Sequence, residues 1–97
     1  MPAWCYILYS PELDRFYIGS SGLVPEHRLE LHNSKKYGNK KFTARSEDWQ
    51  IYLSIECVSV SQARKIEIYI KSMKSRKYIE KLGNEPIFRE WLLNNIR

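Results

Sequence analysis

The chain has 97 residues, with 16 Lys and Arg against 11 Asp and Glu, a formal net charge of +5 and a hydrophobic fraction of 43%. This length favours one domain, and the composition excludes disorder along the whole chain. So small a core leaves no room for a deep internal ligand chamber, so we expect any functional site in a surface cleft. The basic balance favours a polyanionic partner, nucleic acid first.

The two cysteines and the N-terminus indicate the cellular compartment. Cys5 and Cys57 lie in separate apolar runs without a CxxC motif or a Cys/His cluster, so we expect buried, reduced thiols rather than zinc ligands or a disulfide. No apolar stretch is long enough to span a membrane, and Met1 to Ser10 lacks the features of a signal peptide. We therefore expect a cytoplasmic protein with no membrane partner.

The first half of the chain predicts a β-hairpin, a helix and a basic loop. Trp4–Tyr9 and Arg15–Gly19 are short aromatic and aliphatic runs, separated by the turn formers of Pro11–Asp14, which is typical of paired antiparallel strands. Residues Pro25–Ser34 are expected to form a helix, because proline favours the first helical turn. Lysines among Gly, Asn and Ser over Asn33–Asp48 indicate a basic loop.

The second half predicts a strand and three helices. Within Trp49–Val60 a two-residue alternation of apolar residues indicates a third strand with these residues on one face; they are Trp49, Ile51, Leu53, Ile55 and Cys57. Apolar residues at helical spacing predict a helix over Gln62–Met73 and a second one through Tyr78–Leu82, joined near Ser75. A final amphipathic packing helix is expected over 85–97.

The predicted element order is β-β-α-β-α-α plus a C-terminal helix. Strands and helices do not alternate regularly, so the pattern favours a small α+β fold in which a three-stranded antiparallel sheet is flanked by helices. Ser59 and Ser61 are candidates for the cap of the helix that follows the third strand. Phosphate-binding glycine loops such as GxGxxG are absent from the sequence, which disfavours a doubly wound nucleotide-binding fold.

Glu67 is a carboxylate in an unusual place. It lies within or beside the apolar stripe of the helix, among residues 63–70, where an unpaired buried charge is costly. We therefore expect a cation beside it, either a basic side chain or a metal ion. The plain alternative is a carboxylate at the edge of the stripe that turns to solvent or pairs with Lys71 or Lys74.

Four further residues are candidates for chemistry. Arg28 and His32 lie four positions apart on the first predicted helix and so project from the same face. Tyr6 and Tyr17 lie on neighbouring strands of the predicted hairpin. Taken singly, these residues are explained as well by a solvated helix surface and by cross-strand packing.

Their combination resembles the GIY-YIG nuclease family. The first motif is represented by Trp4-Cys5-Tyr6 and the second by Tyr17-Ile18-Gly19, and Arg28 and Glu67 lie on the helices where the family has an arginine and a glutamate. Trp4 and Cys5 replace the glycine and isoleucine of the first motif, whereas the tyrosine is kept. The resemblance implies a nuclease core over residues 4–82.

The stretch Arg28–Ser34 narrows the resemblance within this family. It matches the pattern Arg-Leu-x-x-His-Asn-Ser, which is common among small stand-alone members related to the catalytic domain of bacterial excision-repair nucleases. We therefore expect residues 1–97 to form a single GIY-YIG-like domain, with the core at 4–82 and the packing helix at 85–97.

The resemblance implies a divalent-metal-dependent DNA endonuclease, a hydrolase with a role in DNA repair or recombination. By this similarity Glu67 holds Mg²⁺ or Mn²⁺, Arg28 neutralises the scissile phosphate, and Tyr6 positions water or phosphate. Tyr17 is the expected general base, although a phenol of ordinary pKa ~10 is only about 0.1% ionised at pH 7. Arg28, the metal or a lysine of the basic loop must therefore stabilise the phenolate, and His32 can accept the proton in turn.

The basic loop and the junction between the predicted helices are expected to contact DNA phosphates with low sequence specificity. These residues are Lys35, Lys36, Lys40, Lys41, Arg45, Lys74, Arg76 and Lys77. One alternative is a catalytically weak nucleic-acid-binding module in which Tyr37 and Phe42 stack on bases. Another is an interaction domain built on Phe88 and Trp91, and a protein partner for targeting is left open.

Overall fold

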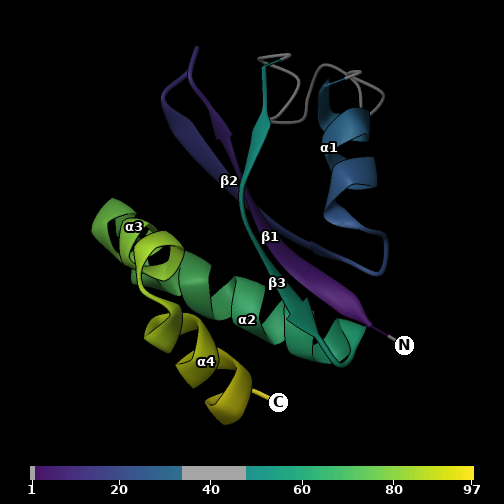
Figure 1. Cartoon of the computed structure of the whole chain (residues 1–97), viewed down its shortest axis with the longest axis vertical. Coiled ribbons are helices and arrows are strands. Elements are labelled where there is room, and N and C mark those ends of the chain that lie inside the picture. The colour runs from purple at the N-terminus through teal and green to yellow at the C-terminus, as the bar shows by residue number, and fades with distance from the viewer. Residues whose placement is uncertain (1, 34–47) are drawn as a thin grey trace.

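A three-stranded antiparallel sheet forms the centre of the fold in the computed structural model (Figure 1). The structure describes residues 2–33 and 48–97, with residues 31 and 32 described by their backbone alone. The strands are β1 (Ala3–Ser10), β2 (Arg15–Ser21) and β3 (Gln50–Cys57), in the order β2-β1-β3. The predicted hairpin and third strand are therefore confirmed.

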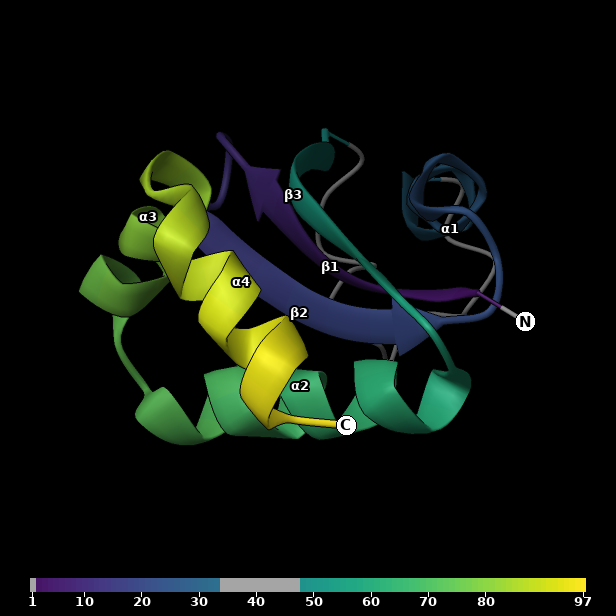
Figure 2. The same cartoon turned by 60° about the horizontal axis from the view of Figure 1, so that its bottom comes forward.

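Helices cover both faces of this sheet (Figure 2). The helix α1 (Pro25–Asn33) contacts β1 and β3 on one face, whereas α2 (Val60–Met73) packs on the other face against all three strands. The chain continues into α3 (Arg76–Asn84) and α4 (Pro86–Asn95) on the side of α2. This arrangement confirms the α+β prediction. In the described parts of the chain, no helix combines the length and apolar character needed to cross a bilayer.

Serine caps set the boundaries of α2 and α3. The Oγ atom of Ser59 accepts a hydrogen bond from the backbone N–H of Gln62 at 3.1 Å, and the Oγ of Ser75 accepts one from Tyr78 at the same distance. Between the two helices Lys74 adopts the left-handed conformation, with φ 48°. The predicted break near Ser75 is therefore confirmed.

Two of the predicted strand ends differ from the structure by more than one residue. The third strand ends at Cys57 rather than Val60, because the cap at Ser59 starts α2 at that point. The second strand does not end at Gly19, since Ser20 and Ser21 continue its pairing with β1. The second difference matters for the site described below, because it places Ser20 in regular strand geometry.

An irregularity in β3 corrects the prediction of one continuous apolar face. Ile7 pairs with Leu53 and the next residue of β1, Leu8, pairs with Ile51, so the register shifts at this point. As a result Ile51 packs with Trp49 on the α1 face, whereas Leu53 joins the cluster on the α2 face. A β-bulge of this kind reverses the faces of the residues beyond it.

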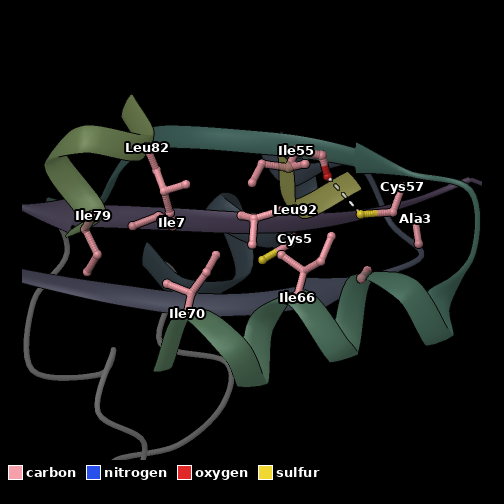
Figure 3. Close-up of a cluster of buried hydrophobic side chains, with 11 residues drawn as sticks. Ala3, Cys5, Ile7, Ile55, Cys57, Ile66, Ile70, Ile79, Leu82 and Leu92 are labelled. Carbon is pink, nitrogen blue, oxygen red and sulfur yellow. Dashed lines mark hydrogen bonds between the residues drawn. The ribbon is translucent and has the colours of Figure 1, made fainter. Parts of the chain in front are cut away.

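The larger core lies between the sheet and α2 (Figure 3). It contains Cys5, Ile66, Ile70 and Leu92, and both cysteines of the chain are free and buried. Burial raises the pKa of the Cys5 thiol far above its usual value, and it also raises that of Cys57. Both side chains therefore remain protonated and pack as small apolar groups, as the sequence predicts.

A polar network ties the hairpin turn to α3. The carboxylate of Asp14, a turn residue with φ 51°, accepts hydrogen bonds from Arg76 at 2.8 Å and from the Tyr9 hydroxyl at 2.6 Å. The guanidinium of Arg76 also lies 5.2 Å from the ring centroid of Phe16. The bonds from Arg76 and then Tyr9 lower the pKa of Asp14 from 3.8 to about 2.

We expect Asp14→Asn to flatten the acid dependence of stability. Because the pKa of Asp14 is depressed in the folded state, its contribution is complete above the unfolded value of 3.8 and is lost as the pH falls through about 2. Thermal melts of both proteins from pH 6 to pH 2 measure this effect. The melting temperatures should converge at the acid end, and a constant difference over the series would contradict the assignment.

Candidate active site

Tyr6 and Tyr17 lie on the face of the sheet that α1 covers. Tyr6 pairs with Gly19 across the hairpin and Tyr17 pairs with Leu8, so their side chains project to the same side. Both belong to a cluster with Trp49, and the rings of Tyr17 and Trp49 meet edge to face with centroids 6.4 Å apart. Tyr6 is only 1% exposed, whereas Tyr17 is half-buried. Tyr17 is therefore the more accessible of the two phenols.

The glycine of the second motif makes room for the first tyrosine. A Cβ atom at Gly19 would lie 2.6 Å from both Cζ and Oη of Tyr6, well inside normal contact distance. The Tyr6 ring therefore lies directly over the backbone of Gly19, a close approach that glycine alone permits. The sequence gives Gly19 as part of a motif, and the structure adds this packing reason.

Gly19→Ala should destabilise the protein by about 1–3 kcal/mol, as overpacking does in a well-filled core. The buried Tyr6 ring must shift, because the added methyl group meets its far end at 2.6 Å. Urea unfolding measures the loss. Gly22→Ala is a matched control, since a Cβ there meets only a Val60 methyl at 3.7 Å. Equal stability of the two variants would contradict the packing argument.

Arg28 projects from the helix that covers the two tyrosines. The first turn of α1 forms as Pro25 predicts, with the N–H groups of His27 and Arg28 bonded to the carbonyl of Val24 at 3.0 and 3.3 Å. The next residue, Leu29, packs against the cluster of Tyr6 and Tyr17. Arg28 itself is half-buried, with its Nε atom inaccessible to solvent. Arg28 is therefore partly sheltered from solvent on the helix that covers the tyrosine side of the sheet.

Asn33 fixes the end of this helix to the start of β3, a role that the sequence analysis missed. Its amide Nδ2 donates to the carbonyl of Trp49 at 3.0 Å, and its Oδ1 accepts from the N–H of Trp49 at 2.8 Å. Asn33 is part of the Arg-Leu-x-x-His-Asn-Ser stretch, and this motif was the sequence signal that could have pointed to it. Of the neighbouring His32, the structure gives the backbone position in α1 alone.

Glu67 reaches β2 from the opposite face of the sheet. Its Oε1 atom accepts a short hydrogen bond from the hydroxyl of Ser20, and its Oε2 atom lies 2.6 Å from Nζ of Lys71. The Glu67 side chain is 13% exposed and that of Lys71 is 51% exposed. The expected cation beside Glu67 is thus Lys71, one of the two lysines that the sequence suggested. Ser20 was not anticipated.

The candidate residues lie on two sides of the sheet. Tyr6 and Tyr17 face α1, the helix that carries Arg28. Glu67 lies on α2, on the other face, and bonds to Ser20, the neighbour of Gly19 on the edge strand β2. Within the described residues, no three His, Cys, Asp or Glu side chains form a cluster that could hold a metal ion. Among the residues that the structure describes, a cation at Glu67 would therefore not have two further carboxylate, cysteine or histidine side chains grouped with it.

Of the expected DNA-binding residues, the structure describes Lys74, Arg76 and Lys77. Lys74 and Lys77 are exposed at the junction of α2 and α3, and Arg76 beside them is bonded to Asp14. The remaining basic residues and both proposed stacking aromatics lie outside the described residues. They are Lys35, Lys36, Tyr37, Lys40, Lys41, Phe42 and Arg45.

Phe88 and Trp91, the basis of the interaction-domain alternative, line a surface pocket of about 410 Å³ together with Tyr69, Tyr78 and Ile87. The ring centroids of Tyr69 and Trp91 lie 5.8 Å apart there. Residues two positions apart on a helix point in nearly opposite directions, so Tyr69 and Glu67 leave α2 on different sides. The pocket is therefore separate from the proposed catalytic residues.

Comparison with known protein families gives a match. The model of the GIY-YIG catalytic domain matches residues 2–79, which include β1 to α2 and the start of α3. No curated protein and no solved structure shows significant similarity to the chain. The matched range covers most of the chain and every candidate catalytic residue. The chain therefore belongs to the GIY-YIG family, and this membership indicates an enzyme with nuclease activity.

Proposed function

We propose that this protein is a divalent-metal-dependent DNA endonuclease of low sequence specificity that acts in DNA repair or recombination. The match to the GIY-YIG catalytic domain over residues 2–79 carries the proposal. The shared face of Tyr6 and Tyr17 under the helix of Arg28 supports it. The resemblance of Arg28–Ser34 to excision-repair relatives favours the cellular role.

Glu67 fits the requirements of a hydrated divalent ion. An ionised carboxylate has about four acceptor positions, and Ser20 and Lys71 use one on each oxygen. Mg²⁺ keeps several waters in enzymes and is usually held by one or two carboxylates with the substrate phosphate, so a single protein ligand suffices. Glu67 would hold this ion, which would supply Lewis-acid stabilisation to the phosphoryl oxygens and the leaving 3′ oxygen.

Arg28 is the proposed phosphate ligand on the other side of the site. Its guanidinium is always charged and can donate two parallel hydrogen bonds to a phosphate. Its partial burial reduces solvent screening, so it stabilises the charge that accumulates on the phosphoryl group. Hydrolysis then leaves a 5′ phosphate and a 3′ hydroxyl.

Tyr17 is the proposed general base, because its half-buried position allows the phenol to meet a water molecule. Tyr6 is fully buried over Gly19 and is proposed to position water or phosphate rather than to titrate. The attacking water gives its proton to Tyr17, and His32 can take the proton onward. This scheme requires a nearby cation to stabilise the Tyr17 phenolate.

Nicking of plasmid and branched DNA with and without Mg²⁺ or Mn²⁺ tests the proposed function. We expect metal-dependent cleavage that EDTA abolishes, with 5′ phosphate ends on the products. DNA binding without cleavage under any of these conditions would contradict it and would favour the catalytically weak binding module.

Lys74 and Lys77 are proposed to contact DNA phosphates together with the basic residues of 35–45. If about four to six phosphates are engaged, the logarithm of the affinity should fall with log salt at a slope of roughly −4 to −5. The double variant Lys74→Gln, Lys77→Gln should make this slope shallower by up to about 2. An unchanged slope would remove both lysines from the binding surface.

A further inference from the structure

The two partners of Glu67 differ in how firmly the protein holds them. Ser20 belongs to β2 and pairs with Cys5 in the sheet, so its backbone is held and its hydroxyl moves only by rotation about one bond. Lys71 reaches Oε2 from one helical turn away, on a flexible side chain that is 51% exposed. One carboxylate oxygen therefore has a partner on a short side chain of the sheet, and the other has a partner that solvent can replace more easily.

A carboxylate as buried as Glu67 requires a positive charge nearby. Its side chain is only 13% exposed, and such a group is costly without a cation partner. The pair with Lys71 is only partly sheltered, because the lysine side chain is 51% exposed, is screened by water and salt, and loses freedom when it pairs. A divalent ion on the same oxygen satisfies the carboxylate more strongly, and its charge repels the ammonium group from the neighbouring acceptor position.

We propose that Lys71 is an exchangeable counter-ion for Glu67, which the divalent cation must displace from Oε2 while Ser20 keeps Oε1 in place. This inference rests on the proposed function, since it concerns the same carboxylate. Lys71 thereby lowers the affinity of the site for metal and keeps Glu67 in position when no metal is bound. Ser20 acts as a positioning residue in both states.

Mg²⁺ titration of the full chain, followed by NMR signals of the lysine side chains, tests the exchange directly. We expect the Lys71 signals to shift and gain mobility as Mg²⁺ binds, whereas those of Lys65 on the same helix stay unchanged. Lys65 is a suitable reference because it is exposed and its ammonium group donates to the carbonyl of Arg97 at 3.0 Å, away from Glu67.

Binding constants of variants give the second readout. Lys71→Met keeps the length of the side chain and should bind Mg²⁺ about twofold more tightly or better, the change that loss of a weak helix pair permits. Lys65→Met removes the same charge and should bind as the wild type does. The advantage of Lys71→Met should shrink at high salt.

Failure of the Lys71 exchange and failure of the metal site at Glu67 give different results. Lys71 signals that stay unchanged at saturating Mg²⁺, or Lys71→Met binding that is equal to or weaker than wild type, would overturn the exchange and leave the metal site intact. If neither wild type nor Lys71→Met binds Mg²⁺, or if Glu67→Gln binds it as well as both, the metal site at Glu67 is wrong and the inference falls with it.

Discussion

Glu67→Gln should reduce metal-dependent DNA cleavage by about 10³-fold while the fold is retained. The substitution keeps the shape of the side chain and removes the charge that would hold the divalent ion. A metal ion at a phosphoryl group contributes several kcal/mol to transition-state stabilisation, and each 1.36 kcal/mol corresponds to about tenfold in rate. Initial rates of plasmid nicking at saturating Mg²⁺ measure the loss.

The structure predicts that this variant folds normally. Its partner Lys71 is half-exposed, so loss of the ion pair should change the free energy of unfolding by no more than about 1 kcal/mol. Glu56→Gln is a matched control, because Glu56 is an exposed carboxylate on β3 and its removal changes the net charge equally. Comparable cleavage by wild type and Glu67→Gln would remove Glu67 from the catalytic assignment.

Tyr17→Phe should lower the cleavage rate by about 10² to 10⁴-fold, the usual contribution of a general base. The change deletes one hydroxyl and leaves the ring that packs edge to face on Trp49. DNA affinity should therefore stay close to that of the wild type, so that kcat falls and KM changes little. Single-turnover cleavage together with binding by fluorescence anisotropy separates these two quantities.

Tyr69→Phe controls for the general loss of a tyrosine hydroxyl. Tyr69 is also half-buried, but it lines the pocket beside Trp91, away from the proposed site. It should cleave DNA at the wild-type rate. Near-normal activity of Tyr17→Phe, or an equal loss in both variants, would show that the hydroxyl of Tyr17 has no specific part in the chemistry.

Most of the fold could be predicted because local signals were strong. The turn formers before Arg15 and the serine at the break between α2 and α3 have short-range physical causes, and the elements form where the sequence places them. The bulge opposite Ile7 and Leu8 could not be predicted, because a register shift depends on the pairing of two distant strands. For the same reason the continuation of β2 through Ser20 was missed.

The candidate site could be predicted in its residue types but only in part in its contacts. Glu67 attracted attention because a carboxylate lay beside an apolar stripe, and the structure shows Lys71 as its cation partner. The hydroxyl of Ser20 and the clamp of Asn33 involve residues 47 and 16 positions apart in sequence. Side-chain contacts over such separations leave no periodic trace in the sequence.

The clamp between Asn33 and Trp49 is one of two ties that hold the residues before β3. A second tie lies beside it, where the Asp48 carboxylate accepts hydrogen bonds from Ser10 at 2.5 Å and from the N–H of Glu12 at 2.8 Å. These bonds join α1, β1 and the residues before β3 around Trp49, so the packing partner of Tyr6 and Tyr17 is held from two directions.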